Sequence, residues 1–242
     1  MIVECGAGAD AARPGGAADT PAGLVLCGGA SRRFGSDKAL VEHDGSTLLE
    51  RTLAVLESCC GRVFLATGAE PRYAATVGDG ARRRVVLDRG PDLGPLAGLE
   101  AGLRAARDAG GSPWLLVLAT DLPNVTSEVL GALLDRAREA LAHVCVWRDA
   151  SGVHPVLAAV HVDALPAVAA ALDRGERRLD AYWGDPLPGS ALEPAGSRVR
   201  VVELGADVLA EAGSDPAANA NTPEELLAIG RARRAQGEEA RR

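Results

Sequence analysis

A glycine-rich turn followed by clustered positive charge is the segment of this sequence best suited to chemistry. It spans residues 27–38 and directly follows residues 23–26, an apolar run typical of a buried strand. Glycines let the backbone pass close to a ligand with its N–H groups exposed, and arginine and lysine add donors and positive charge. The turn therefore predicts a phosphate-binding loop rather than a turn with solvated basic side chains. The residues predicted to hold phosphate are Gly28, Gly29, Arg33 and Lys38.

Two aspartates end predicted strands at the same sheet edge as this loop. Asp88 follows a strand at 84–87 and Asp121 follows one at 114–118, and open α/β sheets bind ligands outside the carboxyl ends of their strands. A carboxylate facing a polyphosphate needs a cation between them, and Mg²⁺ is commonly held by carboxylates plus phosphate oxygens. We predict that Asp121 binds Mg²⁺ and that Asp88 accepts hydrogen bonds from a nucleobase or ribose. For each of them a turn or helix cap is the alternative interpretation.

Further polar positions are less specific. Gly98 lies in a tight turn that offers backbone donors, although a plain turn has the same composition. His154 precedes an apolar run and is a candidate contact for a second substrate, with a structural role as the alternative. Asn219 and Asn221 carry amides that both donate and accept, and helix capping explains only one of them. The paired arginines within residues 175–178 are a candidate anion site, with solvated charge as the default.

The elements that must position these residues alternate between strands and helices. Such alternation predicts a Rossmann-like α/β fold, a three-layer sandwich with a mainly parallel sheet and helices on both faces. Thr47 and Glu50 have the spacing of a capping box. The apolar face of the helix at 127–141 includes Leu141. Strands are expected at 23–27, 63–67, 84–87, 114–118, 144–147, 156–160 and 199–203, and helices at 47–58, 97–108 and 127–141.

Composition and charge limit the classes of protein to which this chain can belong. The 242 residues are 47% hydrophobic with a net charge of −7, which disfavours a generic nucleic-acid binder. No apolar run reaches the ~18 residues of a membrane helix, and the start lacks the features of a signal peptide, so we expect a cytoplasmic protein. The five cysteines match no zinc or disulfide spacing. We expect a flexible leader at 1–22, one domain at 23–230 with a surface excursion at 175–197, and a charged tail at 231–242.

The loop also resembles a known family. Residues 26–38 read Leu-Cys-Gly-Gly-Ala-Ser-Arg-Arg-Phe-Gly-Ser-Asp-Lys. They are similar to the loop of the molybdenum cofactor guanylyltransferases, the MobA-like nucleotidyltransferases, which typically reads Leu-Ala-Gly-Gly-x-Ser-x-Arg-Met-Gly-x-Asp-Lys. The resemblance runs from about residue 23 to residue 227. It continues, in the family's order, through segments 94–98, 120–123, 154–155, 175–178 and 219–226.

This resemblance implies a nucleotidyltransferase that uses Mg²⁺ to transfer GMP from GTP to the molybdenum-molybdopterin cofactor, releasing pyrophosphate. It implies catalytic roles for Arg33, Lys38 and Asp121, with Asp121 as the metal ligand. A transient contact with cofactor-insertion or molybdoenzyme proteins is also expected, because such cofactors are labile. The nucleotide and cofactor contacts that it implies are Leu26, Cys27, Gly28, Gly29, Lys38, Ala66, Asp88, Gly98, Asp121, His154, Asn219 and Asn221.

The sequence leaves other functions open. The family often has an asparagine where this chain has Ala66-Thr67-Gly68, with Thr67 as a candidate substitute, so CTP competes with GTP as the substrate. Another phosphorylated acceptor, such as a sugar or lactyl phosphate, is a further alternative. A non-catalytic nucleotide-binding protein of the same fold is disfavoured because Arg33, Lys38 and Asp121 are retained together. A Rossmann oxidoreductase is disfavoured because its glycine fingerprint is missing.

Overall fold

The structure is a computed structural model. It describes residues 19–28, 37–43, 45–78, 81–187, 191–192, 198–205 and 215–218, together with Thr222, Glu225, Leu226 and Ala228. The expected charged tail and all but the last residues of the expected leader lie outside the described residues, so the predicted domain limits stay a prediction. Within the described part of the chain, no helix is both long and apolar enough to cross a membrane.

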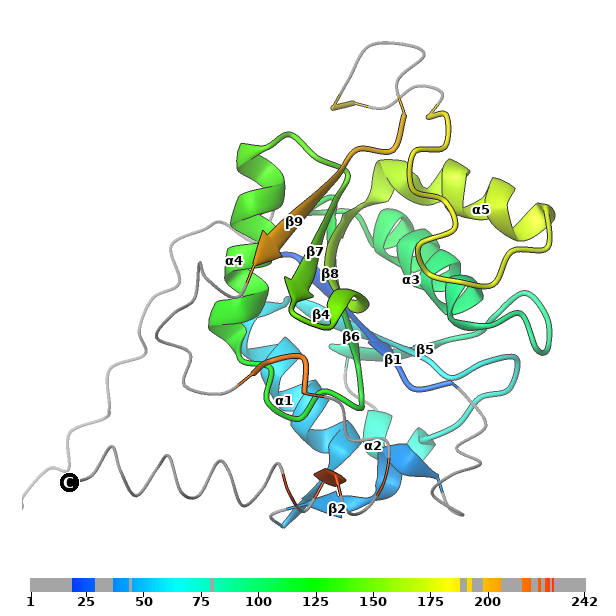
Figure 1. Cartoon of the computed structure of the whole chain (residues 1–242). Coiled ribbons are helices and arrows are strands. Elements are labelled where there is room, and N and C mark those ends of the chain that lie inside the picture. Colours follow the sequence, from blue (N-terminus) through cyan, green and yellow to red (C-terminus); the bar gives the residue numbers. More distant parts are fainter. Residues whose placement is uncertain are drawn as a thin grey trace, which may run out of the picture.

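A twisted sheet of seven strands forms the centre of the part of the chain that the structure describes (Figure 1). Its order is β5-β4-β1-β6-β8-β7-β9, and β8 alone runs antiparallel to its neighbours. The predicted, mainly parallel α/β fold is therefore confirmed. The strands are β1 Ala22–Leu26, β4 Arg62–Ala66, β5 Arg83–Val86, β6 Trp114–Ala119, β7 Val144–Asp149, β8 Gly152–His161 and β9 Val201–Gly205.

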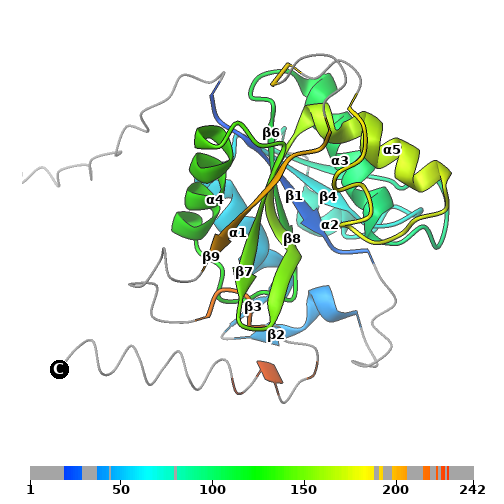
Figure 2. The same ribbon diagram turned by 45° about the horizontal axis from the view of Figure 1, so that its top comes forward.

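Helices cover both faces of the sheet, as Figures 1 and 2 show. Helices α1 (Leu48–Cys59) and α4 (Ser127–Glu139) pack on one face, and α3 (Pro95–Ala109) and α5 (Leu165–Asp173) pack on the other. Two apolar cores result, one on each side of the strands, and their side chains alternate along each strand. The smaller elements are η1 Lys38–Leu40, β2 Glu42–His43, β3 Ser46–Thr47, α2 Ala74–Val77 and η2 Val162–Ala164.

The start of α1 follows directly from its sequence. The Thr47 hydroxyl accepts a hydrogen bond from the Glu50 backbone N–H at 3.1 Å, and the Glu50 carboxylate accepts one from the Thr47 N–H at 2.8 Å. The predicted capping box is thus confirmed. It anchors α1 beside the short β2–β3 hairpin that follows Lys38.

Strand register brings the carboxyl ends of four strands to one edge. Leu26 of β1 pairs with Ala66 of β4 and with Ala119 of β6, and Ala66 in turn pairs with Val86 of β5. The segments that follow these residues must therefore meet. This edge is where the glycine-rich loop, Asp88 and Asp121 all begin.

Two expectations about the fold are wrong. Leu141 is 56% exposed, because α4 ends at Glu139 and Leu141 adopts a positive φ of 50° that turns the chain away. Residues 175–187 are irregular but are not a surface excursion, since Leu179, Tyr182 and Leu187 are buried in the core under α3 and α5. In addition, α5 has no counterpart among the expected helices, because its alanine-rich turns carry little amphipathic contrast.

Candidate functional site

A cavity of about 570 Å³ opens at the carboxyl edge of the sheet. It lies between the ends of β1, β4 and β5 and the first turn of α3, within the size range of about 300–1,000 Å³ that is typical of small-molecule sites. Six residues singled out from the sequence line it: Leu26, Gly28, Ala66, Thr67, Asp88 and Gly98. The structure thus brings together, in one cavity, residues that are up to 72 positions apart in the chain, from Leu26 to Gly98.

Two glycines allow close packing in the walls of this cavity. A methyl group on Gly28 would lie 2.9 Å from the backbone nitrogen of Gly68, closer than real contacts allow. A methyl group on Gly98 would lie 3.0 Å from the Ala66 side chain and 3.2 Å from that of Leu26. Glycine is therefore required at Gly28 because two backbone segments touch there, and at Gly98 because α3 approaches the sheet closely.

Asp88 places a buried carboxylate oxygen at this cavity. Its Oδ1 atom is shielded from solvent and has no hydrogen-bond partner among the described residues. Burial, and then the nearby negative charge of Glu100, raises the pKa of Asp88 above its usual value. A buried acceptor without a partner is costly in the free protein, and a ligand that donates a hydrogen bond to it would remove that cost.

The charge of Glu100 is balanced from two sides. Glu100 is 3% exposed, and its carboxylate accepts hydrogen bonds from Arg89 at 3.0 Å and Arg104 at 2.8 Å. Arg89 also binds Asp173 at 2.6 Å, so it ties the segment after Asp88 to both α3 and α5. This network holds the residue after Asp88 in place, and the Asp88 carboxylate takes no part in it.

The start of α3 forms one wall of the cavity. Gly94 has a φ of 73°, which glycine adopts without strain, and it is followed by Pro95 in the first turn. The Leu96 N–H donates to the carbonyl of Arg177 at 3.3 Å, and the Arg178 side chain binds Asp180. The predicted anion site at residues 175–178 thus lies against the start of α3, with one of its arginines already paired.

Lys38 and Asp121 meet at the same edge of the sheet, after β1 and β6, although neither of them lines the cavity. The Lys38 Nζ atom lies 3.4 Å from Asp121 Oδ2, and Asp121 Oδ1 is buried with no hydrogen-bond partner among the described residues. Lys38 is the only lysine of the chain, and the other 25 cationic side chains of the Lys and Arg set are arginines. One oxygen of this carboxylate thus contacts an ammonium group, and the other has no hydrogen-bond partner among the described residues.

This arrangement fits a magnesium ion that is shared with a substrate. No cluster of three His, Cys, Asp or Glu side chains with metal-site geometry occurs among the described residues. Mg²⁺ needs no such cage, since it is usually held by one or two carboxylates together with substrate phosphates and water. The unpartnered Oδ1 of Asp121 is a suitable hard oxygen ligand for it.

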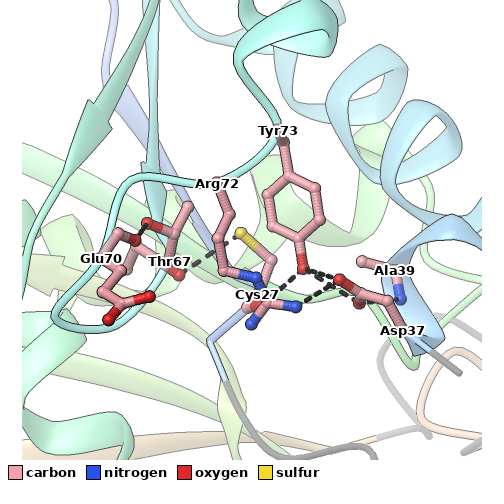
Figure 3. Close-up of polar contacts among 8 residues, drawn as sticks. Cys27, Asp37, Ala39, Thr67, Glu70, Arg72 and Tyr73 are labelled. Carbon is pink, nitrogen blue, oxygen red and sulfur yellow. Dashed lines mark hydrogen bonds and ion pairs between the residues drawn. The ribbon is translucent and has the colours of Figure 1, made fainter. Parts of the chain in front are cut away.

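Figure 3 shows a polar cluster that the sequence did not predict. The Asp37 carboxylate accepts hydrogen bonds from the Tyr73 hydroxyl at 2.8 Å and from the Ala39 N–H at 3.2 Å, and it pairs with the Arg72 guanidinium. The Tyr73 hydroxyl also lies 3.2 Å from the carbonyl oxygen of Cys27. The sequence offered one signal for this cluster, which was the position of Asp37 directly before Lys38. Its partners Arg72 and Tyr73 lie in a segment after β4 that has no recognisable pattern.

Cys27 and Thr67 are less available to a ligand than their positions suggested. The Cys27 side chain is buried on the α1 and α4 face, where its thiol donates to the Ala66 carbonyl at 3.3 Å and burial raises its pKa to about 12. The Thr67 hydroxyl, the candidate substitute for asparagine, donates to the Glu70 carbonyl at 2.7 Å and closes the turn after β4.

His154 lies apart from the cavity. It stands near the start of β8, where its Nε2 atom is 2.7 Å from the Asp149 carboxylate and 3.1 Å from the Ser151 hydroxyl. Burial raises the pKa of Asp149, but hydrogen bonds from Ser151 and His154 outweigh this effect and the pKa is lowered. The observed contacts of His154 therefore stabilise the β7–β8 hairpin, and it does not line the cavity that holds Asp88.

Four predicted site residues lie outside the described residues: Gly29, Arg33, Asn219 and Asn221. Described residues on either side of the two asparagines contact the segment after Asp121 and the start of α1. The Asn124 side chain, three residues after Asp121, donates to the Asp215 carbonyl at 3.2 Å, and Leu226 packs against Leu48 at the start of α1. Thr222 and Glu225 exchange reciprocal hydrogen bonds of the capping-box type.

Comparison with known proteins finds a family model and relatives that match about two thirds of the chain. A family model described as the MobA-like NTP transferase domain matches residues 23–187. A protein from Opitutus terrae named "Probable molybdenum cofactor guanylyltransferase" is 36% identical over 162 residues, which cover 66% of this chain and 76% of that protein. A protein of the same name from Mycobacterium bovis is 37% identical over 164 residues, which cover 66% and 77%.

A solved structure shares the fold. The crystal structure of molybdopterin-guanine dinucleotide biosynthesis protein A from Archaeoglobus fulgidus matches with a TM-score of 0.67 and 23% identity. The match covers 90% of this chain and 99% of that one. At this level of identity, the likeness extends to the fold alone.

Proposed function

The chain belongs to the MobA-like NTP transferase family, and from this premise we propose that it transfers GMP from GTP to the molybdenum-molybdopterin cofactor. The products are the guanine dinucleotide form of the cofactor and pyrophosphate. Its relatives from Opitutus terrae and Mycobacterium bovis carry the name of this activity. The structural observation that carries the proposal is a pair of aspartates at strand ends, Asp88 and Asp121, each with a buried carboxylate oxygen that has no partner among the described residues.

The cavity suits a guanine base or its ribose better than a phosphate. Glu70, Asp88 and Asp92 line it together with one arginine, Arg72. Carboxylates repel phosphate but accept hydrogen bonds from ribose hydroxyls and from base donors. Guanine presents both an N1–H and an N2 amino donor to one carboxylate, whereas cytosine presents only an amino group. The unpartnered oxygen of Asp88 is therefore an acceptor for one base or ribose donor, and the two carboxylate oxygens together would suit the paired donors of guanine.

The triphosphate would extend toward Lys38 and the glycine-rich loop. The Lys38 ammonium neutralises phosphate charge as a point charge, and Asp121 holds that ammonium at 3.4 Å. Asp121 Oδ1 would hold Mg²⁺, which neutralises charge on the phosphate oxygens and polarises the α-phosphorus when it is bound. Lys38 and Asp121 thus set the position of the α-phosphorus relative to the base cavity.

The transfer itself requires little covalent chemistry from the protein. A phosphate oxygen of the acceptor forms a new bond to the α-phosphorus of GTP, and the bond between that phosphorus and the α–β bridging oxygen breaks. The attacking group is already an anion, so no strong general base is needed. The chain's contribution is to position the two substrates and to neutralise charge.

The cellular setting follows from this chemistry. We place the reaction in the cytoplasm, where GTP is available. We also expect the labile product to be passed directly to a cofactor-insertion protein or a molybdoenzyme. A nucleic-acid partner is disfavoured by the net charge of −7.

Nucleotide binding tests this proposal before the acceptor is prepared. GTP, CTP and ATP, each with Mg²⁺, are titrated into the purified protein and into Asp121→Asn by calorimetry. Binding of GTP alone, weakened in Asp121→Asn, supports the proposal and justifies an assay of pyrophosphate release with molybdopterin. A preference for CTP reassigns the protein as a cytidylyltransferase. Binding of GTP without pyrophosphate release in the presence of acceptor indicates a non-catalytic nucleotide-binding protein, and no binding of any nucleotide overturns the proposal.

A further inference from the structure

One tyrosine joins the two ends of the glycine-rich loop. We infer that Tyr73 is a positioning residue that holds the Asp37 end of this loop and thereby places Lys38 against Asp121. Its hydroxyl lies 3.2 Å from the carbonyl oxygen of Cys27, where the loop begins, and 2.8 Å from the carboxylate of Asp37, where the loop ends (Figure 3). A single hydroxyl on the segment after β4 therefore contacts both described ends of the loop, with Asp37 as the nearer acceptor.

Asp37 transmits this constraint to Lys38. It is the N-cap of η1, and its carboxylate accepts the Ala39 N–H at 3.2 Å. Lys38 is the first residue of η1, so the orientation of the Asp37 carboxylate sets where the lysine side chain leaves the backbone. The Asp37 carboxylate is held in turn by Tyr73 and Arg72.

Tyr73 itself is held in an uncommon conformation. Its φ is 60°, a region that bulky residues rarely adopt and that persists where surrounding contacts enforce it. The Arg72 guanidinium lies 5.1 Å from the centre of its ring. Burial, and then the hydrogen bond to Asp37, raises the pKa of Tyr73. The hydroxyl therefore keeps its proton and remains a donor to Asp37 throughout the neutral range.

This inference rests on the proposed function for its consequence, which is the binding of a triphosphate by Lys38. If Tyr73 positions Lys38, removal of its hydroxyl weakens GTP binding only where Lys38 is present. If Tyr73 merely stabilises the fold, its loss acts equally with and without the lysine. A double-mutant cycle separates these two cases.

The experiment measures Mg²⁺–GTP affinity by titration calorimetry in the wild type, Tyr73→Phe, Lys38→Ala and the double variant. We expect Tyr73→Phe to weaken binding about tenfold, as for a lost hydrogen bond to a charged group, and to have less than about a twofold effect in the Lys38→Ala background. Tyr182→Phe is the matched control, because Tyr182 is the other tyrosine of the chain and lies buried on the α3 and α5 face. It should bind as the wild type does.

A second measurement needs no nucleotide. Hydrogen exchange of the Ala39 amide, followed by NMR, should be at least about tenfold faster in Tyr73→Phe than in the wild type or in Tyr182→Phe, because its acceptor Asp37 has lost one of its anchors. Unchanged exchange overturns the inference even if no nucleotide binds, whereas absence of GTP binding by the wild type overturns the proposed function. Equal losses of affinity in both lysine backgrounds, or no loss at all in Tyr73→Phe, also overturn the inference.

Discussion

Lys38 and Asp121 are 83 residues apart in the sequence, and their side chains lie 3.4 Å apart in the structure. The contact joins the end of the glycine-rich loop to the turn after β6. It uses the one lysine of a chain in which arginine supplies all other long cationic side chains. A compact ammonium leaves the second oxygen of Asp121 unpartnered, whereas a guanidinium fork commonly engages both oxygens of a carboxylate.

Asp121→Asn should remove metal-dependent catalysis and leave the fold intact. A bound metal ion supplies several kcal/mol of charge stabilisation in a transition state, so we expect the turnover rate to fall by about 100-fold or more. Pyrophosphate release measured across a range of Mg²⁺ concentrations, with circular dichroism as a check of the fold, tests this. Asp108→Asn makes the same charge change near the far end of α3 and should be silent. Full activity in Asp121→Asn would reject the metal assignment.

Lys38→Ala should weaken GTP binding by about 1–3 kcal/mol, as for a lost hydrogen bond to a charged group. Calorimetry with GTP and guanosine should show a larger loss for the triphosphate, because the lysine is assigned to phosphate. Since the chain has a single lysine, acylation with an amine-directed reagent can be read at one side chain by mass spectrometry. GTP should slow that acylation, and unaltered labelling at saturating GTP would count against the loop assignment.

Asp88→Asn should weaken guanosine-nucleotide binding but stabilise the free protein at neutral pH. The pKa of Asp88 is raised in the folded state by burial and by Glu100, so the folded protein binds more protons than the unfolded chain above the ordinary aspartate value of about 3.9. Stability is therefore lost as pH rises through this window, and an amide at this position avoids the loss. Below the ordinary value, both states hold the proton and the cost disappears.

Urea unfolding of the wild type and Asp88→Asn at several pH values checks this sign. The stability advantage of Asp88→Asn should be larger at about pH 7.5 than at about pH 4.5. If the advantage of Asp88→Asn grew as the pH falls, the surroundings would stabilise the Asp88 carboxylate rather than destabilise it.

Gly28→Ala should destabilise the protein by about 1–3 kcal/mol, as for overpacking at a site that cannot relax. The added methyl group would meet the Gly68 backbone at 2.9 Å, and nucleotide affinity should fall as the two segments separate. Gly131→Ala is the matched control, because nothing lies within 4 Å of a methyl group at that position in α4. It should stabilise the protein by about 0.5–1 kcal/mol through helix propensity. Thermal unfolding of both variants measures the contrast, and equal effects would contradict the close-contact explanation.

The sequence correctly predicted the elements that are encoded by residues close together in the chain. The capping box at Thr47 and the strand before the loop depend on residues within one turn or one short run, and both occur as expected. Local signals failed where packing overrides pattern. Leu141 is apolar and in phase with α4, yet it lies beyond the helix end, and Tyr182 lies in an unpatterned segment that nevertheless enters the core.

The sequence by itself determined the alternation of strands and helices, the composition of the glycine-rich loop and the aspartates that follow β5 and β6, because each is encoded in contiguous residues. Only the tertiary structure decided which of these groups meet. It placed Asp88 in a cavity with Gly28 and Gly98, set Lys38 on Asp121, and brought Tyr73 onto Asp37 and Cys27. It also directed the thiol of Cys27 into the opposite core. These outcomes depend on strand order and register, which are set by the packing of the whole sheet and leave no mark in the spacing of any one segment.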